Sequence, residues 1–139
     1  MNKLEAKADR VFSQYIRLRN ADNNGIVHCF TCGKPLKWRG HGGNDGSAAH
    51  CGHYIKRTKR ALRFNEINCQ VQCLRCNNFL HGNDGVFRRN LVYKYGEEKI
   101  LYLEAQGCKT IRRKAGDYEI IINEYKERVN RELNIRGLK

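Results

Sequence analysis

Apolar side chains recur at helical spacing near both ends of the chain. In the first segment they predict an amphipathic core helix that carries no chemistry and ends at the Asn- and Gly-rich residues 20–25. In the last segment they predict the clearest helix of the chain, with Asp117 as a plausible N-cap. The first stripe consists of Leu4, Ala8, Val11, Phe12, Tyr15 and Ile16, and the second of Tyr118, Ile121, Ile122, Tyr125, Val129 and Leu133.

The chain between these stripes contains most of the glycines and reads as shorter elements. Residues 26–30 and 48–55 are partly apolar and typical of strands, whereas residues 40–46 form a glycine-rich loop with His41 in solvent. Further helices are expected to begin at residues 77–80 and to cover residues 86–95 and 97–106, the last two closed by Gly96 and Gly107. The pattern predicts an α+β fold.

Length and charge narrow the class of protein. A chain of 139 residues forms one domain, divided here into an N-terminal helix (1–25), a core (26–96) and a C-terminal helical region (97–139). Lys and Arg number 27 against 14 Asp and Glu, so the formal net charge is +13. Such an excess attracts polyanions. DNA is favoured over a membrane, because a membrane surface requires a basic helix with aromatic anchors and a span requires about 20 apolar residues.

Two basic clusters are candidates for phosphate contact. A charge run is usually a solvated face, but the place of the first cluster beside the histidines favours phosphate contact. One cluster directly follows His53, and the other lies between the last two predicted helices. Their members are Lys56, Arg57, Lys59, Arg60 and Arg63 in the first cluster, and Arg112, Arg113 and Lys114 in the second.

Four of the seven cysteines form two Cys-x-x-Cys pairs, Cys29 with Cys32 and Cys73 with Cys76. Two such pairs complete a tetrahedral zinc site, and the 40 residues between them leave room for a second functional element. The odd cysteine count and the lack of a signal peptide favour a reducing cytoplasm over a secreted disulfide scaffold. We therefore expect a structural zinc ion.

The residues between and after the cysteine pairs match the parts of a ββα-metal (HNH) nuclease site. His53 on a strand is the candidate base that activates water, and the Asn68 amide is expected to fix its imidazole. Asn77 and His81 are four residues apart, so on a helix they share a face and could hold a catalytic Mg²⁺ or Mn²⁺ ion. His50 is a further candidate ligand of that cation.

Each of these residues also has a simpler reading. A lone histidine is more often a satisfied core or surface residue, and Asn68 and Asn77 could cap a turn and a helix. Many HNH enzymes place an acidic ligand directly before the base, where this chain has Gly52. Residues three apart in a regular strand point to opposite faces, so His50 and His53 could share an ion only across a bulge at Gly52. Three more cysteines, Cys51, Cys69 and Cys108, are interpreted as small buried residues, but Cys51 could still be a ligand because it lies beside the predicted active strand.

Four motifs in this order resemble a phage protein family. Residues 49–55 (AHCGHYI), 63–68 (RFNEIN), 72–77 (QCLRCN) and 82–83 (GN) look like the NinG (Rap) recombination proteins of lambda-like phages, over about residues 29–96. The resemblance implies an endonuclease that acts on branched recombination intermediates, such as Holliday junctions and D-loops, in the host cytoplasm. The Cys-x-x-Cys-Asn step is also similar to phage endonuclease VII, whose asparagine after the cysteine pair binds the catalytic metal, which supports Asn77 as a ligand.

The sequence therefore predicts an α+β domain with a zinc-stapled ββα-metal core flanked by helices, and a metal-dependent DNA endonuclease. A non-catalytic zinc-ribbon DNA-binding protein is the main alternative, and a sequence-specific HNH nicking enzyme is a third. Symmetric junctions need two matched cuts, so we also expect a homodimer. The C-terminal helix is the candidate interface, although packing within the monomer is an equal or better explanation of its apolar stripe.

Overall fold

A computed structural model describes residues 2–39 and 46–139 of the chain. The glycine-rich loop predicted over residues 40–46, with His41, therefore lies outside the described residues except for Gly46. The elements in chain order are α1 (Lys3–Leu18), β1 (Ile26–His28), β2 (Pro35–Lys37), β3 (His50–His53), a 3₁₀ turn (Arg60–Leu62), β4 (Cys69–Gln72), a π-helix (Arg75–Phe79), α2 (Asp84–Tyr95), α3 (Glu97–Gln106) and α4 (Ala115–Arg136). The mixture of helices and small sheets confirms the predicted α+β class.

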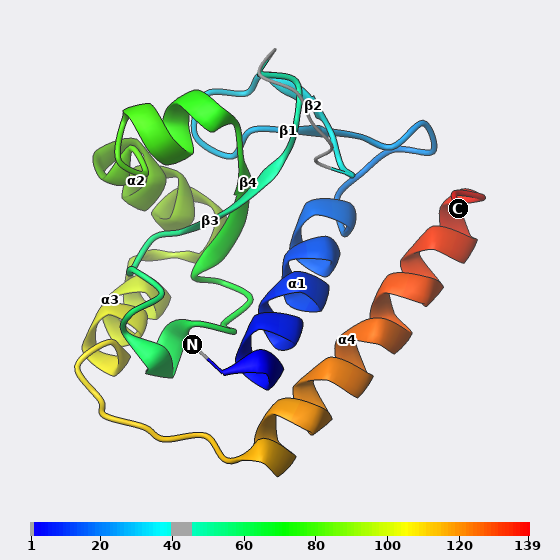
Figure 1. The fold of residues 1–139 in the computed structure, drawn as a ribbon. Coiled ribbons are helices and arrows are strands. Elements are labelled where there is room, and N and C mark those ends of the chain that lie inside the picture. Colours follow the sequence, from blue (N-terminus) through cyan, green and yellow to red (C-terminus); the bar gives the residue numbers. More distant parts are fainter. Residues whose placement is uncertain (1, 40–45) are drawn as a thin grey trace.

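The elements lie in layers around the β3–β4 hairpin (Figure 1). α1 covers one side of this hairpin, and α4 packs on the outer side of α1. α2 and α3 lie on the other side of the hairpin and pack on each other around a second, smaller apolar core. Within the described residues, no helix is long and apolar enough to cross a membrane.

The two predicted stripes form the packing surface between α1 and α4. Phe12 on α1 meets Tyr125 on α4 edge to face, with ring centroids 4.9 Å apart. Asn2 caps α1 by accepting a hydrogen bond from the Glu5 backbone N–H at 2.6 Å. Asp117 is not the N-cap of α4, as the sequence had suggested. It lies in the first turn and accepts from the backbone N–H of Lys114, the actual N-cap, at 2.7 Å.

Both sheets are antiparallel two-stranded ribbons. β1 pairs with β2 around the first cysteine pair, and β3 pairs with β4, with His50 opposite Gln72 and His53 opposite Cys69. β4 was not predicted, because all four of its residues are buried and the chain shows no alternation of apolar and polar positions there. The β3–β4 register runs without interruption, so the bulge considered at Gly52 is not formed.

Of the three helices between β4 and α4, two agree with prediction. α2 and α3 cover the predicted segments, and Gly96 separates them with φ of 95°, a conformation that favours glycine. The helix expected to begin at residues 77–80 is instead a short π-helix, Arg75–Phe79, which starts inside the second cysteine pair and contains Cys76. The chain then turns at His81, whose φ is 51°, so Asn77 and His81 do not share the helix face that was expected of them.

Candidate metal centre and active-site groove

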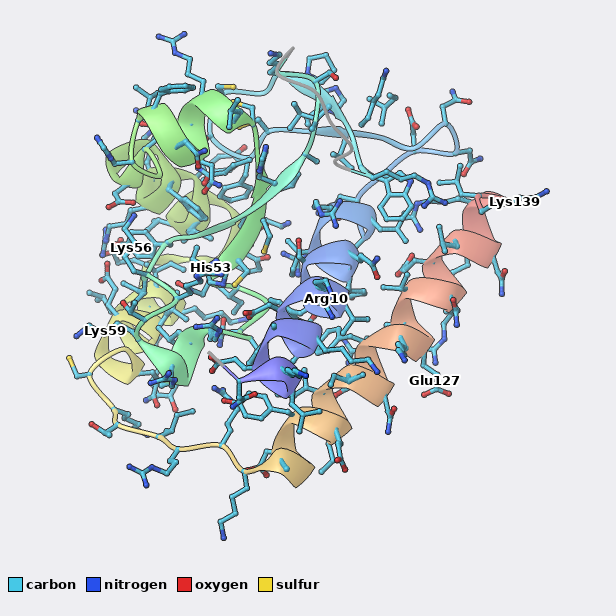
Figure 2. The ribbon with its side chains drawn as sticks, viewed as in Figure 1. Arg10, His53, Lys56, Lys59, Glu127 and Lys139 are labelled. Carbon is cyan, nitrogen blue, oxygen red and sulfur yellow. The ribbon has the colours of Figure 1, made fainter. Side chains whose placement is uncertain are left out.

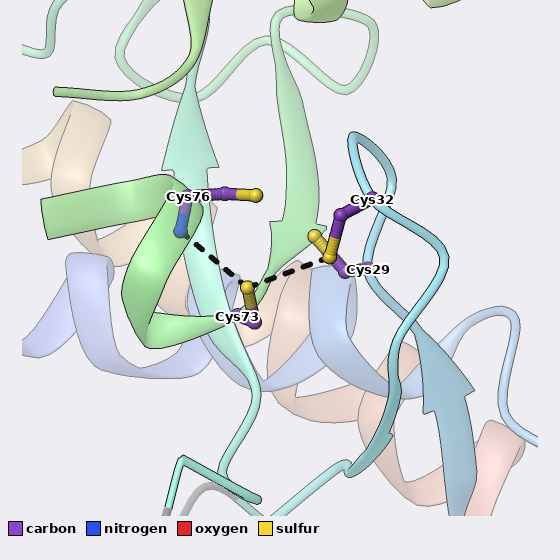
Figure 3. A group of neighbouring side chains, drawn as sticks. All are labelled: Cys29, Cys32, Cys73 and Cys76. Carbon is purple, nitrogen blue, oxygen red and sulfur yellow. Dashed lines mark hydrogen bonds between the residues drawn. The ribbon is translucent and has the colours of Figure 1, made fainter. Parts of the chain in front are cut away.

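The two cysteine pairs meet because β4 connects them. The Phe30 backbone N–H donates to the Val71 carbonyl at 2.8 Å, which joins the residue after Cys29 to the strand that leads into Cys73. The sulfur atoms of Cys29, Cys32, Cys73 and Cys76 consequently lie within 4.8 Å of one another, and none is in a disulfide (Figure 3). This arrangement agrees with the predicted ligand set.

The donor set fits zinc in its chemistry as well as in its position. Burial raises the pKa of Cys29, but hydrogen bonds, chiefly with the Thr31 hydroxyl, outweigh it and lower the pKa to about 6. Burial and the neighbouring thiols raise the pKa of Cys32 to about 12. Four thiols this close together can all ionise only when a cation binds between them. Four thiolates are a typical ligand set of structural zinc. The Cys76 backbone N–H and the Asn83 amide add hydrogen bonds to the sulfurs of Cys73 and Cys76.

His53, at the end of β3, has a defined tautomer. Its Nε2 lies 3.0 Å from the carbonyl oxygen of Arg63, and a carbonyl only accepts, so Nε2 carries the proton and Nδ1 keeps its lone pair. Burial is the main cause that lowers the pKa of His53 below the ordinary imidazole value, and the hydrogen bond to Arg63 opposes it in part. The imidazole is therefore neutral near pH 7, and no group within residues 2–39 and 46–139 forms a hydrogen bond with Nδ1.

A groove of about 340 Å³ lies between α1 and β3, and His53 lines it. His50 and Asn77 line the same groove, so the structure brings together three of the predicted site residues. From α1 come Asp9, Arg10 and Arg17, although this helix was expected to carry no chemistry. These residues lie on the polar face of an amphipathic helix, and the sequence alone does not show whether such a face borders a groove or bulk solvent.

Asn68 is buried, but it does not contact the imidazole as predicted. Its Oδ1 accepts from the Ile55 backbone N–H at 2.8 Å, and its Nδ2 donates to the carbonyls of Ile55 and Leu62 at 3.0 and 3.2 Å. Arg63, which holds His53, is the residue after Leu62. Asn68 therefore holds the two backbone segments beside His53, namely the turn that carries the Arg63 carbonyl and the residues that directly follow β3.

The structure gives a reason for glycine directly before His53. A Cβ atom at position 52 would lie 2.0 Å from the Oε1 atom of Gln72, so this chain has no room for an acidic ligand there. The Asp9 carboxylate reaches the groove, but both of its oxygens accept hydrogen bonds from the Arg63 guanidinium, at 2.9 and 2.6 Å. His81 is not among the residues that line the groove.

The basic cluster after His53 divides into paired and unpaired residues. Arg63 is only 4% exposed and is paired with Asp9, so its prediction as a phosphate ligand is wrong. Arg60 lies 3.4 Å from Glu5, and Lys56 lies 3.6 Å from Asp84. Within residues 2–39 and 46–139, no acidic side chain forms an ion pair with the two remaining members, which are Arg57 and Lys59.

The second basic cluster lies beside the first. Arg113 donates to the carbonyl of Arg60 at 2.8 Å, and its guanidinium lies over the Phe64 ring. It therefore has a structural role, whereas Arg112 and Lys114 are exposed. The prediction that Cys108 is buried is wrong, since its side chain is exposed. Cys69 is buried as predicted, and Cys51 is half-buried beside the groove.

Comparisons with known proteins cover both the tetrad and the groove. The chain matches the family model described as "Bacteriophage Lambda NinG protein" over residues 1–134. A curated relative, "Protein ninG" of Escherichia phage lambda, is 29% identical over 120 residues, and the match covers 76% of this chain and 50% of that protein. The chain thus spans about half the length of the curated relative that it matches. No solved structure matches.

Proposed function

Because the chain belongs to the NinG family of phage proteins, we propose that it is a metal-dependent endonuclease that hydrolyses phosphodiester bonds in branched DNA. The substrates we propose are recombination intermediates such as Holliday junctions and D-loops, as the four motifs around His53 imply. The cysteine tetrad holds a structural zinc ion in this proposal and fixes the π-helix against the β3–β4 hairpin.

The state of His53 is the observation that carries the proposal. A general base needs a neutral imidazole with one nitrogen free and the ring held in place. The Arg63 carbonyl fixes Nε2–H at 3.0 Å, burial keeps the ring neutral, and the ring borders a groove that is open to solvent. In the part of the chain that the structure describes, no hydrogen bond occupies Nδ1, so this nitrogen can accept a proton as a base must.

In the proposed reaction, Nδ1 of His53 takes a proton from a water molecule in the groove. The water oxygen forms a bond to phosphorus as the bond to the leaving deoxyribose oxygen breaks. That oxygen takes the electron pair and is protonated by solvent, and the His53 imidazolium returns its proton to solvent. Loss of a general base costs about 10²- to 10⁴-fold in rate, which sets the scale expected for His53.

His50 and Asn77 are the proposed ligands of the catalytic cation. Both line the groove beside His53, and they offer one imidazole nitrogen and one amide oxygen. A Mg²⁺ or Mn²⁺ ion bound there would stabilise the negative charge of the transition state, with waters and phosphate oxygens completing its coordination. His81 was predicted with them, and its place outside the groove removes it from the set we propose.

DNA contact is proposed for the exposed cations around the groove. Arg10 and Arg57 line the groove itself. Lys59, which is labelled in Figure 2 together with Arg10 and His53, is two residues after Arg57 in the chain. The neighbouring second cluster adds Arg112 and Lys114. Long-range attraction by a net charge of +13 supports binding without base readout, as a structure-specific enzyme requires.

A homodimer remains part of the proposal, but the apolar stripe of α4 is not available as its interface. The apolar stripe of α4 is buried within the chain against α1, with Tyr118, Ile122, Tyr125 and Val129 all below 9% exposure. Changing Ile122 or Val129 to Asp would therefore damage the core and would not test dimerisation. Light scattering with and without junction DNA tests the oligomeric state directly.

The proposed function is tested by incubating the protein with a four-way junction and with a linear duplex, with and without Mg²⁺ or Mn²⁺. We expect cleavage of the junction only when a cation is present, and little cleavage of the duplex. Junction binding without cleavage under every cation condition would favour the zinc-ribbon DNA-binding alternative, with which the tetrad and the basic surface are also compatible. Cleavage of the duplex at one sequence would favour a nicking enzyme.

A further inference from the structure

A second group of soft metal ligands lies on the face of the β3–β4 hairpin that carries His53. The sulfurs of Cys51 and Cys69 and one imidazole nitrogen of His53 are all within 4.8 Å of one another. The strand register explains this group, because Cys51 is two residues before His53 on β3 and Cys69 is directly opposite His53 on β4. Residues in these positions project from the same face of a sheet.

We propose that Cys51, His53 and Cys69 form a second site for zinc or a similar soft divalent ion, distinct from the tetrad and from the Mg²⁺ or Mn²⁺ position. Two thiolates and one imidazole are a known zinc ligand set that leaves a fourth position for water. Cys51 and His53 both line the groove, so an ion can enter from solvent and the fourth position can face the groove. Hard cations such as Mg²⁺ prefer oxygen ligands and would not compete for two sulfurs.

The register favours a metal ion over a disulfide between the same two cysteines. Cys51 pairs with Val71 and Cys69 pairs with His53, so the two cysteines are diagonal neighbours. Diagonal Cα atoms in an antiparallel pair are about 7–8 Å apart. A disulfide needs Cα atoms no more than about 7 Å apart, whereas an ion that bridges two sulfurs spans a longer gap. The pair is therefore better placed to hold an ion than to be oxidised.

A shared hydrogen-bond acceptor holds the side chains of Cys69 and His53 beside each other. Cys69 is fully buried and lies 3.6 Å from the carbonyl of Arg63, the same carbonyl that accepts from His53.

An ion at this site would prevent His53 from acting as a base. A neutral imidazole has one free lone pair, and when one nitrogen binds a metal the other carries the proton. Whichever nitrogen is used, Nδ1 can no longer accept a proton from water. The existence of the site does not depend on the proposed nuclease function, but this consequence for cleavage rests on it.

The binding claim is tested with protein that already holds one zinc ion per chain, titrated with Co²⁺ while the thiolate-to-cobalt absorption is followed. We expect wild type and Cys108→Ser, a control at an exposed cysteine, to bind one further equivalent. Cys51→Ser should weaken that step by about 100-fold or more, because even outer partners of metal ligands are worth about 10- to 100-fold. Cys69→Ser should do the same where it folds. A wild type that binds no second equivalent, or a Cys51→Ser variant that binds it as tightly, would overturn the proposal.

Cleavage of a four-way junction in Mg²⁺ gives the second readout, as the ratio of rates with and without added zinc. We expect zinc to slow wild type and Cys108→Ser strongly and to slow Cys51→Ser much less. A protein that binds the second ion but never cuts DNA would retain this site and lose the proposed function. A protein that cuts DNA but takes up no second ion would lose this inference alone.

Discussion

Asn68 offers a quantitative test of how the site is held together. Its side chain is fully buried and makes three hydrogen bonds to the backbone of Ile55 and Leu62. Each such bond contributes about 0.5–1.5 kcal/mol, so Asn68→Ala should lower the free energy of unfolding by about 2–4 kcal/mol. Urea unfolding at constant zinc concentration, followed by circular dichroism, measures this difference. Asn78→Ala is the matched control, because Asn78 is exposed and should change stability by no more than about 0.5 kcal/mol.

The same variant should impair chemistry more than binding. Leu62 is held by Asn68, and the next residue supplies the carbonyl that fixes His53. Loosening this turn should reduce the cleavage rate at saturating junction and shift its pH midpoint upward, as the imidazole becomes more hydrated and its pKa returns toward the ordinary value. A variant whose stability lies within about 0.5 kcal/mol of wild type, or whose pH midpoint is unchanged, would refute this reasoning.

Three further predictions concern the metal, the base and the DNA surface. Elemental analysis should find about one tightly bound zinc per chain, and Cys73→Ser should lose it and unfold; a stable, zinc-free variant would argue against a structural role. The cleavage rate should rise with pH and level off at a pKa below that of free imidazole, because burial lowers the pKa of His53 and only its neutral form accepts a proton; activity that falls over this range would contradict the assignment. Changing Arg57 and Lys59 together to Ala should reduce the magnitude of the slope of log K against log salt concentration by up to about 2, since each phosphate contact contributes about 0.9. Arg63→Ala should instead destabilise the fold, because it leaves Asp9 unpaired in a partly buried site.

Much of the helical framework could be predicted because a helix shows a local sequence pattern, namely apolar residues at helical spacing and glycines at its ends. The stripes of α1 and α4 and the glycines around α3 are local patterns, and the structure follows them closely. The tetrad was predictable for a different reason. Cys-x-x-Cys spacing has few uses other than binding metal, so two such pairs predict each other over 40 residues of intervening chain.

The site itself depends on contacts that no local pattern encodes. β4 is buried on both faces, so it shows no alternation, and the carbonyl that holds His53 belongs to a backbone turn rather than to a side chain. The role of Arg63 follows from its partner Asp9, which is 54 residues away on α1. Charge alone indicated a phosphate ligand, and only the fold shows that this charge is already neutralised.

The most direct test of the account is single-turnover cleavage of a four-way junction by wild type and His53→Ala, with junction affinity and zinc content measured in parallel. His28→Ala, at an exposed histidine on β1 outside the groove, is the matched control and should cut like wild type. We predict that His53→Ala binds the junction and zinc normally and cuts about 10²- to 10⁴-fold more slowly. Cleavage by His53→Ala at the wild-type rate would contradict the central claim that this histidine is the base of a nuclease.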